Sequence, residues 1–187
     1  MKPIKQLNFT EFDFDININP EDKKDLSECA IFFEGEGEMI RIMNRTSEFL
    51  STIPKGKYTI YKTGGTHRLA EYSGREDFPF IVNNFTNKQI DTIYSKGNYP
   101  VVNIRAIPGK HTIKTRKGLA MHRLAGMAFI ENPMKDKLNL IDHINEDKFD
   151  YSVNNLKWVN NSMNMKNIKN TISNTPHKVK VLREHYE

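Results

Sequence analysis

An aspartate and a histidine stand side by side in the C-terminal half of the chain, at Asp142 and His143. Asn155 follows 12 residues after the histidine, and Asn164 follows 21 residues after it. Carboxylate and amide oxygens are hard ligands that suit Mg²⁺, which takes few protein ligands and keeps several waters. An imidazole can take a proton from water, and a divalent ion can stabilise charge on a phosphate and on its leaving oxygen. These residue types are together sufficient for phosphodiester hydrolysis.

The segments around these residues predict the elements that would position them. Residues 138–141 predict a short strand that runs into the aspartate, and residues 156–159 predict a second strand. A polar loop at 144–154 connects them, and a helix is predicted from the N-cap candidates at 160–162 to about residue 170. When such a hairpin packs on a helix, the end of its first strand can lie beside the start of the helix. The carboxylate and the later amide would then face each other with the imidazole nearby.

A helix and a hairpin are predicted upstream of this unit. Residues 119–130 predict a helix because five apolar side chains between Met121 and Phe129 fall on one stripe at helical spacing. The pair Asn132-Pro133 ends that helix. Before it, residues 99–107 alternate as a strand does, and residues 111–116 predict the return strand after a Pro-Gly turn.

The N-terminal half predicts mostly β-structure. Residues 1–26 are polar and acidic, and they predict a loosely packed arm. Residues 27–50 predict a strand, a turn and a second strand, and Gly64-Gly65 predicts another turn. The predicted strands of this half are Ile31–Phe33, Met39–Met43, Lys57–Lys62 and Phe78–Asn83.

Charge is distributed unevenly over the 187 residues, which carry a formal net charge of +5. Residues 1–50 carry a net −5, and residues 51–187 carry a net +10. A basic C-terminal part suits a nucleic acid, because cationic side chains displace condensed counterions from phosphates. A solvated basic surface is the alternative that charge alone favours.

Composition excludes several classes of protein. The single cysteine, Cys29, rules out an internal disulfide framework and a multi-cysteine zinc cluster. No apolar run approaches the roughly 20 residues that span a bilayer, so no membrane partner is expected. The first residues have no apolar core of a secretory signal, so we expect an intracellular protein that is not secreted, in the cytoplasm of a prokaryotic host or in a host cell if it is viral.

Residues 119–164 resemble the HNH nucleases, the ββα-metal family, and within it the zinc-free branch of phage and intron homing endonucleases. The matching stretches are MHRLAGMAFIENP, LIDHINEDK and NNLKWVNNSMNMKN, in order and at matching separation. The resemblance implies an α+β fold in which a C-terminal ββα-metal nuclease core follows a β-rich N-terminal region. It divides the chain into an acidic arm and β-rich region at 1–96, a nuclease domain at 97–170 and a basic polar tail at 171–187. The Asn/Lys/Ile-rich usage adds a suggestion of a phage, a virus or a mobile element.

The resemblance also implies roles for individual residues. His143 would be the general base, and Asp142 and Asn164 would hold one divalent ion, Mg²⁺ or alternatively Mn²⁺, with no structural zinc. Asn155 would complete the catalytic motif by bridging the loop backbone and holding the histidine in place. Cleavage would leave 5′-phosphate and 3′-hydroxyl ends. For Asn164 alone, an ordinary asparagine at a helix start is the rival interpretation.

Double-stranded DNA is the partner that the resemblance implies. Each basic side chain could instead be a solvated charge, and His122 could be structural rather than bound to a phosphate. The oligomeric state stays open. The candidate DNA contacts are Arg105, Lys114, Arg116, Lys117, His122, Arg123, Lys166 and Lys169.

Two positions depart from the family pattern. Glu146 stands where the family commonly has a glycine, and Asp150-Tyr151 stands where an Asp-Asn pair is often found. Both lie in the loop and bear on its geometry more than on the chemistry. Two other classes of function compete with a nuclease. One is a DNA-binding protein without catalysis on a decayed HNH scaffold. The other is an interaction protein whose acidic front engages a partner.

Overall fold

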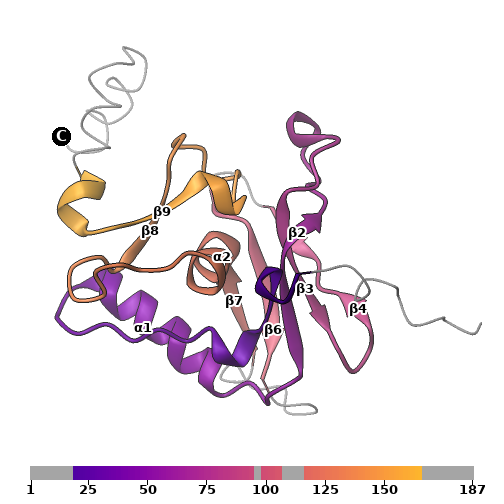
Figure 1. Cartoon of the computed structure of the whole chain (residues 1–187), viewed down its shortest axis with the longest axis horizontal. Coiled ribbons are helices and arrows are strands. Elements are labelled where there is room, and N and C mark those ends of the chain that lie inside the picture. The colour runs from indigo at the N-terminus through magenta and orange to yellow at the C-terminus, as the bar shows by residue number, and fades with distance from the viewer. Residues whose placement is uncertain (1–18, 95–97, 107–115, 166–187) are drawn as a thin grey trace, which may run out of the picture.

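The computed structural model describes residues 19–94, 98–106 and 116–165, without the side chains of residues 116 and 117. Two helices, α1 (Glu38–Ser51) and α2 (Met121–Phe129), pack with antiparallel sheets in this part of the chain (Figure 1). Neither helix is long and apolar enough to cross a membrane. The mixture of helices and antiparallel sheets agrees with the predicted α+β class.

The strands form three sheets, in each of which neighbours run antiparallel. The first sheet has the order β1-β2-β3-β4, with strands Lys23–Asp25, Tyr58–Gly65, Phe78–Asn83 and Lys88–Gln89. The second has the order β5-β6-β7, with strands Thr92–Ile93, Val101–Arg105 and Arg116–Ala120. The third pairs β8 (Leu140–His143) with β9 (Leu156–Val159). Short 3₁₀ turns lie at Pro20–Asp22, Leu26–Glu28, Ala70–Tyr72 and Val153–Asn155, and residues 161–165 are helical.

Helix α2 lies between the β8–β9 hairpin and the strands β6 and β7, and α1 contacts β8 (Figure 1). The approach of α2 to β8 is close at Gly126, where an added Cβ would lie 2.4 Å from Ile141 Cδ1. The Trp158 indole on β9 donates to the carbonyl of Ile130 at 3.0 Å, just beyond the helix end. These contacts fix the hairpin against α2.

One cluster of buried apolar side chains runs through the described residues, from Leu26 in the N-terminal part to Val159 on β9. The rings of Phe33 and Trp158, for example, lie 5.6 Å apart. The cluster crosses the predicted boundary at residues 96–97. The three-part division of the chain remains a prediction.

Helix α1 overturns the prediction of two strands in residues 27–50. Its buried side chains include Met43, Ser47 and Leu50, which the helical period places on one face. The predicted strand at 39–43 is therefore wrong, because these apolar residues belong to a helix. The predicted strand at 31–33 is also wrong, because the backbone there bonds to Ser47 and Asn44 side chains of α1.

Two further predictions in the N-terminal part are corrected. The last residues of the predicted loose arm are ordered, since β1 pairs with β2 and Leu26 is fully buried, while residues 1–18 lie outside the described residues. Gly64 and Gly65 do not form a turn but end β2. Gly65 pairs with Phe78, whose carbonyl oxygen would lie 2.6 Å from an added Cβ, so the close approach requires a glycine there.

The strand predicted at Phe78–Asn83 is confirmed, and β2 overlaps the one predicted at 57–62. In the C-terminal half, β6, α2 and β9 lie where strands and a helix were predicted. Strand β8 starts two residues later than predicted and extends through His143. The predicted return strand at 111–116 lies outside the described residues except for its last residue, which opens β7, and so does the predicted helix beyond residue 165.

Candidate active site

The β8–β9 hairpin presents the Asp-His pair at the end of its first strand. Asp142 lies opposite Lys157, and His143 lies opposite Leu156. The Asp142 carboxylate accepts a hydrogen bond of 2.9 Å from the backbone N–H of His143. Asp142 is half-buried, whereas the His143 side chain and backbone together are 4% exposed.

Two rings from distant parts of the chain meet at this histidine. The ring of His122, in the first turn of α2, lies 4.9 Å from the ring of His143. The ring of Tyr99 lies 4.5 Å from His122 and 5.8 Å from His143, nearly parallel to the latter. Tyr99 is 43% exposed, and the two imidazoles are buried. We call Tyr99, His122 and His143 the imidazole cluster.

Two nitrogen atoms in the imidazole cluster are buried without a hydrogen-bond partner among the described residues, Nδ1 of His122 and Nε2 of His143. Leaving a buried polar group unpaired costs about 1–3 kcal/mol, so native proteins rarely do so without a reason. One such reason is that the nitrogen binds a water molecule or a substrate when the protein functions. The cluster is therefore a candidate site.

Burial lowers the pKa of both imidazoles. The pKa of His122 lies well below its ordinary value because of burial and because of the nearby His143 and Arg123. Burial also lowers the pKa of His143, although the carboxylates of Asp142, Asp147 and Asp150 act in the opposite direction. Both rings are therefore neutral at neutral pH. The neutral imidazole is the form that can accept a proton from water.

The loop after His143 is held by its own amide side chains. The Asn155 carboxamide accepts from the backbone N–H of Asn145 at 3.1 Å and donates to the Asn145 side chain and to the Asp150 carbonyl, each at 2.8 Å. The backbone N–H of Ile144 donates to the Asn155 carbonyl at 2.7 Å. Asn155 thus bridges the two ends of the loop beside His143. Its role in catalysis stays a prediction.

Asn164 lies in the helical segment 161–165, which Asn160 caps by accepting from the backbone N–H of Met163 at 2.8 Å. The last residue of β9 lies opposite Leu140, two residues before Asp142, so this helical segment begins beside the strand that carries the aspartate. Both candidate ligands are half-buried oxygen donors.

The donor set fits a hard divalent ion. A carboxylate and an amide oxygen leave room for several waters, which Mg²⁺ retains in most protein sites. Within residues 19–94, 98–106 and 116–165, no group of three or more His, Cys, Asp or Glu side chains is placed to hold a metal ion. A metal here would therefore depend on the two oxygens of Asp142 and Asn164.

The predicted DNA contacts differ in exposure, and some of them lie outside the described residues. Arg105 is exposed at the end of β6, and Arg116 lies opposite it on β7. Arg123 is half-buried, and burial lowers the pKa of its guanidinium. His122 is only 3% exposed and packs against the Tyr99 ring, so it does not offer a surface contact to a phosphate in this conformation. Lys117 follows Arg116 on β7, and Lys114, Lys166 and Lys169 lie outside the described residues.

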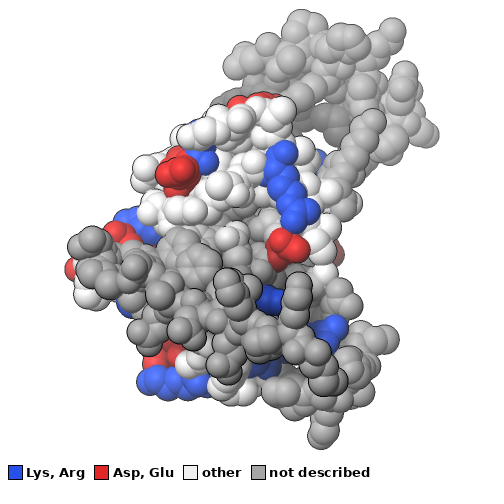
Figure 2. All heavy atoms as spheres, turned by 90° about the vertical axis from the view of Figure 1, so that its right-hand side faces the viewer, with Lys and Arg blue, Asp and Glu red and all other residues white. Residues whose placement is uncertain are grey.

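The described residues carry as many Asp and Glu side chains as Lys and Arg, 18 of each. Figure 2 shows lysine and arginine side chains scattered among acidic and uncharged ones over the described part of one face. The net positive charge of the chain therefore belongs to the remaining segments of the sequence. Residues 166–187 alone carry a net +3.

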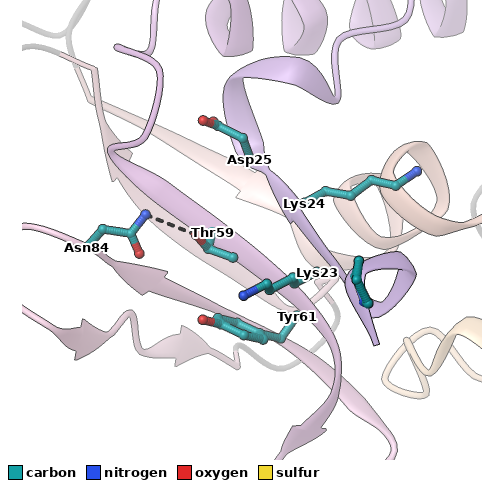
Figure 3. A pocket seen from close by; sticks show the side chains of 7 residues that line it. Lys23, Lys24, Asp25, Thr59, Tyr61 and Asn84 are labelled. Atoms are coloured by element: carbon teal, nitrogen blue, oxygen red, sulfur yellow. Dashed lines mark hydrogen bonds between the residues drawn. The ribbon is translucent and has the colours of Figure 1, made fainter. Parts of the chain in front are cut away.

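A surface hollow lies elsewhere, on the first sheet (Figure 3). Two of its polar side chains have structural partners: Asp25 accepts from the backbone N–H groups of Ser27 and Gly56, and the Asn84 carboxamide donates to Thr59. The hollow holds no imidazole. It is lined by Pro20, Lys23, Lys24, Asp25, Thr59, Tyr61 and Asn84. We therefore place the candidate chemistry at the imidazole cluster.

Sequence reasoning did not single out several residues around the site. Tyr99 was predicted only as the start of a strand, and Asn145 and Asp150 only as positions of the family's loop pattern, without the contacts that they make. Two residues of the N-terminal part also contact the loop that follows His143: His67 bonds to the Phe149 carbonyl and Arg75 to the Asp150 carboxylate. No local pattern could have shown these contacts, because the partners are far apart in sequence.

No family model matches the chain, and no curated protein matches it. The chain is similar to one solved structure, which describes DNA binding and cleavage by the HNH homing endonuclease I-HmuI, with 18% sequence identity and a TM-score of 0.46. The similar region covers 70% of this chain and 62% of that chain, so this chain spans less than two thirds of its length. A similarity at this level carries no argument about the chemistry of this chain.

Proposed function

We propose that this protein is a metal-dependent DNA endonuclease of the HNH type. The observation that carries the proposal is the buried Nε2 of His143, which has no hydrogen-bond partner among the described residues and sits on a neutral ring next to Asp142. The resemblance of residues 119–164 to the HNH motif supports the same function, because it assigns a general base and a metal ligand to these two positions.

In the proposed reaction, His143 Nε2 takes a proton from a water molecule, whose oxygen attacks the phosphorus. The bond from phosphorus to the 3′ oxygen breaks, and that oxygen takes up a proton from solvent. The products carry a 5′-phosphate and a 3′-hydroxyl. A divalent ion held by Asp142 and Asn164 would supply charge stabilisation on the phosphate and on the leaving oxygen.

The other residues of the site position and cover the base. Asp142 accepts from the backbone N–H of His143, and Asn155 ties the two ends of the loop together. The ring of Tyr99 packs against both imidazoles. Because His143 is only 4% exposed, a local rearrangement must precede the access of a water and a phosphate to Nε2.

Double-stranded DNA is the proposed substrate, with residues 97–170 as the nuclease domain of an intracellular protein. The exposed Arg105, together with Lys166 and Lys169, would contact phosphates. Such contacts fix the position of the backbone but carry no sequence information.

The test is cleavage of supercoiled plasmid in Mg²⁺ or Mn²⁺, with EDTA as a control. His143→Ala should remove cleavage by about 10²–10⁴-fold while duplex binding is retained. His177→Ala is the matched control, since this histidine lies outside the described residues and has no assigned role. Full activity of His143→Ala would contradict the proposal.

A DNA-binding protein without catalysis is the second candidate, and the burial of His143 favours it. In that case the wild-type protein would bind duplex DNA with a strong salt dependence but would not cut it in either metal.

A further inference from the structure

A short segment of the N-terminal part reaches across to the loop that follows His143. This segment, residues 67–77, connects β2 to β3 and contains the 3₁₀ turn Ala70–Tyr72. Within it, the His67 ring bonds to the Phe149 carbonyl at 3.0 Å, and the Tyr72 hydroxyl donates to the Asp147 carboxylate. The loop is therefore braced from outside as well as from within.

The central contact is a two-point ion pair. The guanidinium of Arg75 donates to both carboxylate oxygens of Asp150, at 3.0 and 3.2 Å, and to the Ser152 hydroxyl at 3.2 Å. The same guanidinium binds both oxygens of Asp77, at 2.9 and 2.8 Å, and lies over the Phe78 ring at 4.6 Å. A planar group held at this many points has little freedom to move.

Asp150 needs this partner because its side chain is only 8% exposed. Burial by itself would raise the pKa of Asp150, but the hydrogen bonds from Arg75 and Ser152 outweigh it and lower the pKa. The carboxylate is therefore charged, and its position follows the guanidinium.

From Asp150 the contacts lead directly to the residues beside His143. The Asn145 carboxamide donates to the Asp150 carboxylate at 3.3 Å, and Asn155 donates to the Asp150 carbonyl at 2.8 Å. Asn145 and Asn155 bond to each other, and the backbone N–H of Ile144, which follows His143, donates to the Asn155 carbonyl. Four residues thus connect a guanidinium of the N-terminal part to the backbone that immediately follows the candidate base.

We propose that Arg75 is a positioning residue for His143, acting through Asp150, Asn145 and Asn155. The inference rests on the proposed nuclease function for its effect on the reaction rate. It also assigns to the N-terminal part a task that the resemblance does not cover, since the matching stretches begin only at residue 121. The site is then complete only when residues 67–77 are docked on the loop.

The first experiment compares two conservative variants. Arg75→Lys keeps the positive charge but loses the two-point contact, and Arg68→Lys is the matched control, because Arg68 is an exposed arginine of the same segment that pairs with Asp91. Single-turnover cleavage of plasmid at saturating Mg²⁺ should fall at least fivefold in Arg75→Lys and stay within twofold of wild type in Arg68→Lys. The Kd for duplex DNA in EDTA should stay within twofold in both variants.

A loss of rate with unchanged affinity supports positioning, whereas a merely structural role would lower rate, affinity and thermal stability together and would overturn it. Wild-type cleavage by a folded Arg75→Lys would also overturn it. Should Arg75→Lys not fold, Asp150→Asn replaces it, since an amide at 150 keeps an acceptor for Asn145 but loses the ion pair. The same rate and affinity criteria apply.

A second measurement does not depend on cleavage. Amide hydrogen exchange at Ile144 and Asn145 should accelerate at least fivefold in Arg75→Lys, while exchange within α1 stays unchanged. If the wild-type protein cuts no DNA, the proposed nuclease function fails, yet accelerated exchange at these two amides still supports the positioning of His143 by Arg75. Unchanged exchange there would overturn the inference whatever the cleavage assay gives.

Discussion

The two sides of His143 are built differently. On one side, the 144–155 loop pairs its polar groups closely, through Asn145, Asn155 and Asp150. On the other side, the imidazole cluster buries two nitrogens that have no hydrogen-bond partner among the described residues. Paired polar groups fix a conformation, whereas unpaired ones cost stability and are retained where a ligand or a reaction uses them. Under the proposed function, the loop is therefore the part that would position the base, and the cluster is the part that would react.

The largest effect is expected at Asp142, where the two regions meet. Asp142→Ala removes a candidate metal ligand and the acceptor of the His143 backbone N–H. We expect Mg²⁺-dependent cleavage to fall by at least about 100-fold, and the metal concentration for half-maximal rate to rise. A metal titration of single-turnover cleavage measures both quantities. Wild-type metal dependence in this variant would remove Asp142 from the site.

In the loop, Asn145→Ala should destabilise the protein. The change removes one hydrogen bond each from the Asn155 carboxamide and the Asp150 carboxylate, and because the first is exposed and the second partly buried, each loss costs about 0.5–1.5 kcal/mol. Urea unfolding of variant and wild type gives the difference in the free energy of unfolding. A change below about 0.3 kcal/mol would mean that the loop does not depend on its internal bonds.

In the imidazole cluster, a polar-to-apolar change should have the opposite effect on stability. His122→Phe removes a buried nitrogen that has no hydrogen-bond partner among the described residues, so the free energy of unfolding should stay the same or rise by up to about 2 kcal/mol. Cleavage should nevertheless fall about tenfold, because the ring facing His143 changes. A large loss of stability would show that His122 is an ordinary core histidine with a hydrogen-bond partner outside the described residues.

A smaller effect is expected from pH at His67. The backbone N–H of Leu69 donates to Nδ1 of His67, so Nε2 carries the proton and donates to Phe149. Burial lowers the pKa of His67, against the smaller opposing effects of the Phe149 carbonyl and nearby carboxylates. The unfolded chain then binds more protons than the folded protein below pH about 6.5, so stability falls as the pH decreases from there.

The variant His67→Gln should flatten this decrease, by at most about 1 kcal/mol between pH 6.5 and 5, because glutamine keeps a donor but does not titrate. Thermal unfolding across that range measures it. An unchanged slope would show that the pH dependence comes from other groups, His122 and His143 among them.

The smallest effect is expected at Glu146, whose φ of +64° lies in the left-handed region. The HNH pattern commonly has a glycine here, and glycine adopts this conformation without steric cost. Glu146→Gly should stabilise the protein by about 0.5–1 kcal/mol, with cleavage unchanged. A destabilised variant would mean that contacts of the glutamate side chain outweigh the strain of its backbone.

Much of the fold around the site could be predicted from the sequence, because its signals are local. The alternation at Leu156–Val159 and the apolar stripe of α2 each arise within one element. Helix α1 was missed because the apolar residues Met39, Ile42 and Met43 are as compatible with a strand as with a helix when the residues that they pack against are unknown. The helix is favoured by the hydrogen bonds that the Ser47 and Asn44 side chains accept from the backbone of residues 31–33, and the sequence alone does not reveal these bonds.

The site could be predicted only in part. The Asp142-His143 pair and Asn155 follow from the spacing of a motif. Tyr99 and Arg75 could not be found in this way, since their partners lie 44 and 75 residues away, in other elements. Sequence patterns report local geometry, whereas an active site is completed by contacts between distant segments.

The most direct test of the central claim is the conversion of supercoiled plasmid to open-circle or linear DNA by the purified protein. With Mg²⁺ or Mn²⁺, the wild-type protein should nick or cut, and neither the EDTA control nor His143→Ala should. Metal-dependent cleavage that His143→Ala retains, or wild-type protein that binds duplex DNA and cuts it with neither metal, would contradict the assignment of His143 as the general base of a nuclease.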